Sequence, residues 1–111
     1  MSNINIKFKI DSKSSNYQYK GNGSINKDII SFKDNESDYY IDFAFKKITK
    51  MTKKELVVID LKKSCIELKL DKLNTKLDIK VIEYKKGDNS LSIKYKLEEE
   101  VNVLLEWSMY E

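Results

Sequence analysis

Apolar and polar residues alternate along most of this chain, which is the pattern of strands with one buried and one wet face. In the N-terminal run, residues 4–10, isoleucine and phenylalanine alternate with asparagine and lysine. The last third carries three further runs, at residues 75–81, 90–97 and 101–111. Between the first two of these lies the turn-forming segment 85–89 (Lys-Lys-Gly-Asp-Asn). We therefore expect an antiparallel meander in the last third of the chain.

The middle of the chain repeats this rhythm. We predict further strands at residues 17–23, 28–33, 39–45, 55–61 and 64–70. Their connections are short, so neighbouring strands pair antiparallel. So many strands form either a barrel or a sandwich, and the up-and-down order without a long crossover favours the barrel. We predict one all-β domain over residues 1–111, an antiparallel up-and-down β-barrel of about eight or nine strands, with the last strand pairing with the first.

One face of these strands should line the interior. The expected interior residues are Ile4, Ile6, Phe8, Tyr39, Ile41, Phe43, Ile66, Leu68, Leu77, Ile79, Ile93, Tyr95, Val103, Leu105 and Trp107. Trp107, the only tryptophan, should point inward with Met109 and plug one end. A barrel of this size is either filled by side chains or holds one small apolar ligand. For such a ligand we predict an interior site made of Phe8, Tyr39, Phe43, Tyr95 and Trp107.

Two segments allow two interpretations each. Residues 46–55 could form a short helix with lysines on one arc, or a strand that continues past Phe45 and turns over residues 49–52. The weak helix formers and the missing N-cap favour the strand and turn. Gly21 and Gly23 lie two apart in a strand, which indicates a bulge, a bend or a close backbone approach. The alternative is that they leave room for a ligand.

The composition excludes several common kinds of catalytic and binding site. The chain has no histidine, arginine or proline, and its 21 basic residues, all lysines, stand against 18 acidic ones. Without histidine it lacks the usual near-neutral general base and the commonest transition-metal ligand. Without arginine it lacks the bidentate fork that grips phosphates. We predict a protein that is not an enzyme and that carries no metal site and no cofactor.

The single cysteine and the short apolar runs indicate the compartment. Cys65 can form no internal disulfide, which fits a reducing environment. The N-terminus lacks the apolar segment of a signal peptide, and the longest apolar run, residues 56–59, is far too short to span a membrane. We expect a cytoplasmic protein without a membrane partner. The alternation places Cys65 half-exposed on the outer face, without a histidine to activate it.

The lysines suggest one alternative partner. Small barrels bind single-stranded nucleic acid with aromatic rings on a face and lysines along a groove. Here the candidate cluster is Lys46, Lys47, Lys50, Lys53 and Lys54, with Tyr40, Tyr84 and Tyr110 on the outer face. The net charge of only +3, with acidic residues spread among the lysines, argues against this alternative.

Three segments together resemble a known family. The runs at residues 19–23 (Tyr-Lys-Gly-Asn-Gly), 30–34 (Ile-Ser-Phe-Lys-Asp) and 91–97 (Leu-Ser-Ile-Lys-Tyr-Lys-Leu), followed by a final strand, are similar to the YwiB-like family. This is a bacterial family of unknown function with a calycin-like, that is lipocalin-like, β-barrel. The resemblance implies such a barrel and no particular activity. The leading hypothesis is thus a non-enzymatic barrel that binds a small apolar ligand or serves as an interaction module. Self-association, through an edge strand or through Tyr40 and Leu104, would make it a homo-oligomer.

Overall fold

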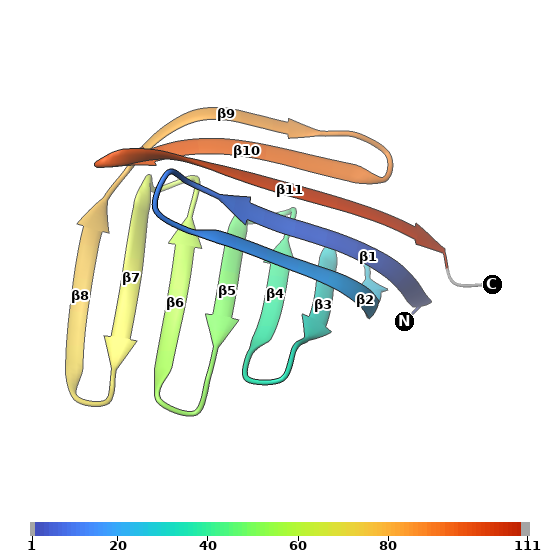
Figure 1. The fold of residues 1–111 in the computed structure, drawn as a ribbon, viewed down its shortest axis with the longest axis horizontal. Helices are drawn as coiled ribbons and strands as arrows, with labels where there is room; N and C mark the ends of the chain where they lie inside the picture. Colours follow the sequence, from blue (N-terminus) through green and yellow to red (C-terminus); the bar gives the residue numbers. More distant parts are fainter. Residues whose placement is uncertain (1, 110–111) are drawn as a thin grey trace.

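The chain forms one antiparallel sheet that curls into a nearly closed barrel (Figure 1). The computed structural model describes residues 2–109. Its strands are β1 (Ser2–Asp11), β2 (Asn16–Asn26), β3 (Ile29–Lys33), β4 (Asp38–Asp42), β5 (Lys47–Met51), β6 (Glu55–Asp60), β7 (Cys65–Leu70), β8 (Leu73–Asp78), β9 (Lys80–Lys86), β10 (Ser90–Leu97) and β11 (Glu99–Met109). No helix in this part of the chain is long and apolar enough to cross a membrane.

The two ends of the chain meet in the middle of the ladder. The strand order is β8-β7-β6-β5-β4-β3-β2-β1-β11-β10-β9, so β1 pairs with both β2 and β11. Ile6 lies opposite Trp107 and Phe8 opposite Leu105, which confirms the predicted pairing of the last strand with the first. In Figure 1, β3 to β8 lie in one layer, crossed by the layer of β9, β10, β11, β1 and β2. The ladder ends at β8 and β9, which do not pair with each other.

The barrel has 11 strands, more than the eight or nine expected. Residues 46–55 form no helix; they form β5 and a turn at 52–54, so the strand interpretation was right about the strand but placed the turn too early, at 49–52. The chain does not run straight past Phe45, however, because a further turn at residues 43–46 separates β4 from β5. The run at 75–81 is likewise interrupted at Ile79, between β8 and β9. Regular alternation hides such turns because their residues keep the apolar-polar rhythm.

A recurrent apolar-Asp-apolar triplet builds the turns at one end of the barrel. It occurs at residues 41–43 (Ile-Asp-Phe), 59–61 (Ile-Asp-Leu) and 77–79 (Leu-Asp-Ile). The third residue of each triplet donates its backbone N–H to a carbonyl of the preceding turn: Phe43 to Asp28, Leu61 to Lys46, and Ile79 to Ser64, at 2.8, 2.9 and 3.0 Å. These bonds link successive turns into one rim. The triplets are an internal repeat that strand alternation alone does not reveal.

A β-bulge reverses the alternation in β9. The register between β9 and β10 shifts so that Glu83 faces Lys94 while Val81 faces Tyr95, which leaves Ile82 as the extra residue. Ile82 is therefore 47% exposed. Tyr84, expected on the outer face, instead packs against the core. Beyond the bulge, the predicted assignment of side chains to the inner and outer faces of β9 was therefore wrong, because the extra residue reverses it.

The interior holds the predicted apolar face almost entirely. All the expected residues are buried or packed against the buried cluster. The alternation did not single out Ile30, Phe32, Ile48, Ile59, Leu61 and Leu91, which are buried as well. Met109 is 60% exposed, so its expected inward position was wrong, because β11 extends past the barrel end.

The two glycines of β2 lie very close to other atoms of the protein. A Cβ atom on Gly23 would overlap the Ile6 side chain and lie 2.6 Å from the Ser31 carbonyl oxygen. A Cβ atom on Gly21 would lie 2.7 Å from the Tyr19 hydroxyl oxygen. Protein atoms therefore lie close to both glycines, although Gly21 also borders an open groove.

Candidate functional site

The five aromatic residues predicted to line an interior site lie in three separate places. Phe8 and Tyr39 are 1% and 3% exposed, and their ring centroids are 5.6 Å apart. Phe32 packs against both, at 5.2 Å from Phe8 and 4.9 Å from Tyr39. Tyr17 and Tyr19 extend this stack on its outer side. The predicted pair Phe8 and Tyr39 thus belongs to a packed aromatic stack.

The other three predicted residues lie away from that stack. Tyr95 is buried on β10, and burial raises the pKa of its hydroxyl. Phe43 and Trp107 stack on each other at 5.3 Å, at the end of the barrel where β4 meets its turn. The structure therefore brings together two pairs, Phe8 with Tyr39 and Phe43 with Trp107.

A partly buried hydrogen bond between Tyr17 and Asp34 lies at the end of the barrel opposite Trp107. The Tyr17 hydroxyl donates to Asp34 Oδ2 at 2.6 Å. Asp34 Oδ1 accepts the backbone N–H groups of Glu36 and Ser37, which closes the β3–β4 turn. Burial, with the adjacent Asp34 and Tyr39, raises the pKa of Tyr17. Partial desolvation acts to raise the pKa of Asp34, but the Tyr17 hydroxyl and the two N–H groups hold it below the usual value. Tyr17 is thus a constant donor, which suits structure better than proton transfer.

The predicted basic cluster is divided between the two ends of β5. Lys46 lies in the turn before β5, whereas Lys53 and Lys54 lie in the turn after it. Of the two lysines within the strand, Lys47 lies 3.8 Å from Asp60 and Lys50 lies 4.0 Å from Glu55. Two of the five lysines thus lie near carboxylates, and the other three lie in two different turns.

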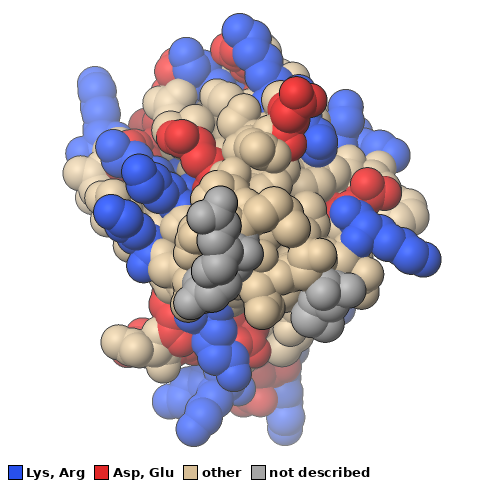
Figure 2. All heavy atoms as spheres, turned by 90° about the vertical axis from the view of Figure 1, so that its right-hand side faces the viewer, with Lys and Arg blue, Asp and Glu red and all other residues tan. Residues whose placement is uncertain are grey.

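The surface charge is also mixed. On the face that Figure 2 shows, lysines and carboxylates are interspersed. Of the exposed tyrosines predicted with the cluster, Tyr40 is exposed, Tyr84 packs against the core, and Tyr110 lies outside the described residues.

A different group of lysines meets aromatic rings at one end of the barrel. Lys46 lies 4.7 Å from the ring centroid of Tyr84, Lys62 lies 5.6 Å from Phe45, and Lys86 lies 4.9 Å from Phe43. Lys86 also lies 6.0 Å from the Trp107 ring. We call this group the aromatic-lysine end: Phe43, Phe45, Tyr84 and Trp107 with Lys46, Lys62 and Lys86.

The turns of the triplet rim position this group. Asp42 Oδ1 accepts the backbone N–H of Phe45 at 3.0 Å, and Lys46 follows with a φ of 53°. Asp60 does the same for the next turn, accepting the N–H groups of Lys62 and Lys63. Phe45 is held in this way with 61% of its surface exposed. The turn thus directs Phe45 away from the barrel interior.

Sequence reasoning missed most of the aromatic-lysine end. Lys62 and Lys86 lie far apart in the chain and carry no motif of their own. Burial, together with the charge of Asp42, raises the pKa of Tyr84. This is consistent with the Tyr84 ring packing against the core of the barrel. The available signal was the repeated triplet, which marks both turns that carry Phe45 and Lys62.

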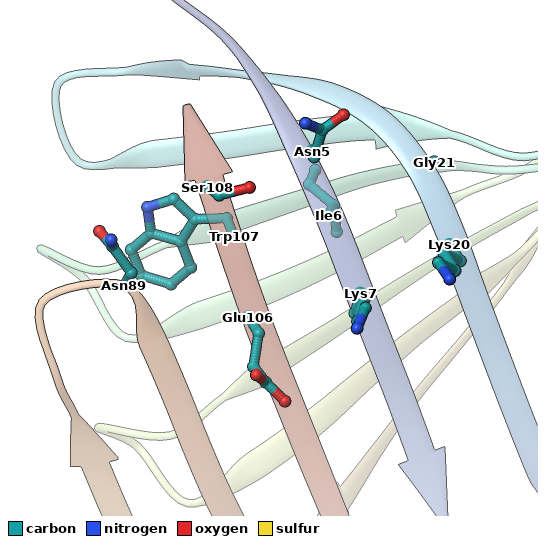
Figure 3. A pocket seen from close by; sticks show the side chains of 9 residues that line it. All are labelled: Asn5, Ile6, Lys7, Lys20, Gly21, Asn89, Glu106, Trp107 and Ser108. Carbon is teal, nitrogen blue, oxygen red and sulfur yellow. The ribbon is translucent and has the colours of Figure 1, made fainter. Parts of the chain in front are cut away.

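An open groove of about 440 Å³ lies nearby, on the outer side of β1 (Figure 3). It is lined by Asn5, Ile6, Lys7, Lys20, Gly21, Asn89, Glu106, Trp107 and Ser108. Lys7 lies opposite Lys20 on one side and opposite Glu106 on the other. In Figure 3, the Trp107 indole lies beside Asn89, away from the two lysines. The groove thus adjoins the aromatic-lysine end through Trp107 but presents mixed charges of its own.

The residues considered for covalent or metal chemistry are not arranged for it. Cys65 is 1% exposed, so its expected half-exposed position was wrong; the β6–β7 turn closes directly before it, opposite Asp60. Within residues 2–109, no three acidic or cysteine side chains gather in a group that could hold a metal ion.

Comparison with known proteins gives a weak likeness in fold. No family model matches this chain, and no curated protein matches it in sequence. Among solved structures, the crystal structure of the ywiB protein from Bacillus subtilis aligns over 98% of this chain and 91% of its own length. The sequence identity is 10% and the TM-score is 0.48. YwiB is thus a structural neighbour of this nearly closed antiparallel barrel, at a similarity too low to transfer any function.

Proposed function

We propose that this protein is a non-catalytic binding protein on a calycin-like barrel, and that its ligand joins a flat aromatic or apolar body to an anionic group. The supporting observation is the aromatic-lysine end. Three ammonium groups lie over aromatic rings there, and one of these rings is the exposed Phe45. The close packing of Phe8, Phe32 and Tyr39 in the interior favours the outer end as the place for a ligand.

The geometry suits such a ligand for two reasons. Each lysine is held over a ring by an attraction of about 0.5–1 kcal/mol at an exposed site, so its position is partly organised before binding. An ammonium group has three hydrogen-bond donors, and the contact with the ring face leaves them available to an anion. An anion can therefore bind Lys62 while its aromatic body stacks on Phe45, with each contact reinforcing the other.

Fluorescence offers a direct test. The probe is anilinonaphthalene sulfonate, which has an aromatic body and one sulfonate, and the intrinsic reporter is Trp107. We expect saturable binding that changes Trp107 emission and that is lost in the double variant Phe45→Ala, Lys62→Ala. The matched control is Lys53→Ala, Lys54→Ala at the opposite end of β5, which should bind as the wild type does. Equal binding by both double variants would overturn the proposal.

An apolar ligand in the interior remains a separate hypothesis, with Phe8, Tyr39, Phe43, Tyr95 and Trp107 as its site. A fluorescent fatty-acid analogue tests it, because such a ligand needs the barrel to open between packed rings. Binding that survives the loss of Phe45 and Lys62 but fails in Phe8→Leu would favour the interior.

Single-stranded nucleic acid is a second candidate, because the structure brings Lys46 onto the Tyr84 ring. An oligothymidylate would stack on exposed rings and bind lysines, with an affinity that falls steeply with salt. If the aromatic-lysine end is the site, Lys46→Glu with Lys62→Glu should abolish binding, whereas Lys47→Glu with Lys50→Glu should not. The absence of binding at low salt would exclude this candidate.

A further inference from the structure

We propose that β8 is a self-association edge, through which a second copy of this chain adds its own β8 antiparallel and extends the sheet across a twofold axis. This inference is independent of the proposed function, because it concerns the open side of the barrel. The other edges of the ladder are closed by β1 pairing with β11, which leaves only β8 and β9 free.

The strand β8 is unprotected in the described structure. Every one of its residues except Leu77 is exposed, and Leu73 is 71% exposed. Figure 1 shows β8 at the outer border of its layer, with β9 leaving its end and crossing other strands instead of covering it. Such an edge presents unpaired N–H and C=O groups to another strand.

The alternation of backbone hydrogen bonds along β8 shows which of its N–H and C=O groups have no partner in β7. Ile79 N–H donates to the Ser64 carbonyl, so residue 79 bonds toward β7. Pairs alternate along an antiparallel ladder, so residues 77, 75 and 73 also bond toward β7. The N–H and C=O groups of Asn74, Lys76 and Asp78 therefore point to the free edge.

One register of two antiparallel β8 strands that satisfies these groups and the charges is centred on Thr75. With Thr75 opposite its own copy, Asn74 faces Lys76 and exchanges both backbone bonds with it. In the same register, Leu73 lies opposite Leu77 on the inner face, and Lys72 lies beside Asp78.

Shifts of this register by one or two residues conflict with the sequence. A shift by two residues places Lys76 opposite Lys76, or Lys72 opposite Lys76, and like charges directly across a ladder are destabilising. A shift by one residue turns the leucines of one copy to the wrong face. The register centred on Thr75 is isologous, so each copy contributes the same surface to a closed dimer.

The apolar face adds to the same interface. Leu70 of β7 is 45% exposed and lies next to Leu73 across the hairpin. In the dimer these leucines from both copies gather along the inner face. The β9 edge is less suited to pairing, because the bulge at Ile82 interrupts its ladder.

The first test is the oligomeric state of the whole chain, measured by sedimentation velocity over the widest attainable concentration range. We expect a reversible monomer-dimer equilibrium. Lys76→Pro should abolish it without unfolding the protein, because the Lys76 N–H points to the free edge and an edge proline is tolerated there. Retained far-UV circular dichroism establishes that the variant folds. A monomer at every concentration, or a dimer that Lys76→Pro leaves intact, would overturn the proposal.

Charge exchange tests the register. Asp78→Lys should weaken the dimer about tenfold, because two symmetry-related attractions become repulsions. Adding Lys72→Glu in the same chain should restore the dimer. Glu83→Lys makes the same charge change on the β9 edge and should leave the dissociation constant unchanged. If the double change fails to rescue, the proposed register is wrong.

Crosslinking tests the twofold axis. Thr75→Cys should form a disulfide-linked dimer under mild oxidation, because residues directly opposite in a ladder lie within disulfide range. Leu73→Cys should not, since its opposite residue is Leu77. The native Cys65 is buried and does not interfere. Preferential crosslinking of Leu73→Cys would contradict the axis through Thr75.

Discussion

Trp107 is the residue on which one end of the barrel depends. It is 7% exposed, stacks on Phe43, and donates its backbone N–H to the Asn89 carbonyl. Replacing it with alanine removes a buried ring and leaves a cavity. We expect Trp107→Ala to lower the free energy of unfolding by about 3–5 kcal/mol, measured by urea denaturation with circular dichroism. A near-neutral effect would mean that the ring does not pack as described. Phe45→Ala, which removes an exposed ring at the same end, is the control and should change stability little.

The bond between Tyr17 and Asp34 should appear as a pH-dependent term in stability. The pKa of Asp34 is lowered in the folded state, so its contribution is present above pH 3.8, the usual aspartate pKa, and is lost as the pH falls through the folded pKa. We expect Tyr17→Phe to cost about 1 kcal/mol at neutral pH. The difference from the wild type should shrink below pH 3.8.

A matched tyrosine provides the control for this pH dependence. The Tyr19 hydroxyl donates to the backbone carbonyl of Asn22 at 2.8 Å, an acceptor that does not titrate. The stability change of Tyr19→Phe should therefore be the same at pH 3 and at pH 7. If Tyr17→Phe shows no pH dependence either, the bond to Asp34 is not maintained in solution.

At the scale of elements, the triplet aspartates are similar in sequence but not in structure. Asp60 is 4% exposed and accepts two backbone N–H groups, whereas Asp78 is exposed at the edge of the sheet. We expect Asp60→Ala to lower the free energy of unfolding by about 1–3 kcal/mol, because two donors lose their partner. Asp78→Ala should have almost no effect in the monomer. Thermal unfolding at low protein concentration compares the two variants, and equal losses would contradict the rim described here.

The bulge in β9 predicts a contrast between two isoleucines. Ile6 is 1% exposed and Ile82 is 47% exposed. We expect Ile6→Ala to cost about 2–5 kcal/mol and Ile82→Ala to stay within about 0.5 kcal/mol. Chemical denaturation of both variants checks this. A large loss at Ile82 would place that side chain in the core and remove the bulge.

At the scale of the molecule, the barrel is one continuous ladder around one core. The order of strands contains no second sheet, and β1 joins the first and last parts of the chain. We expect a single cooperative unfolding transition. Trp107 fluorescence reports one end of the barrel and far-UV circular dichroism reports all strands, so their midpoints should coincide. Separate midpoints would show that the layer of β3 to β8 unfolds independently.

The residues of the core could be predicted with considerable success, whereas the surface site could not. Strand alternation is a local signal, and burial of one face follows from it directly. Phe8, Tyr39, Tyr95 and Trp107 are therefore buried as expected. The aromatic-lysine end depends on contacts between turns distant in the chain, such as Lys46 with Tyr84, and on a bulge that no local pattern marks.

The sequence by itself determined that this protein is an antiparallel β structure with an aromatic interior, because a period of two assigns each side chain to a face. It also determined the absence of histidine and arginine chemistry. The tertiary structure alone decided that the ladder has 11 strands, that the five predicted aromatic residues lie in three places, and that β8 keeps an open edge. The reason is physical: turns, bulges and ring closure depend on hydrogen bonds between distant segments, and these carry no periodicity of their own.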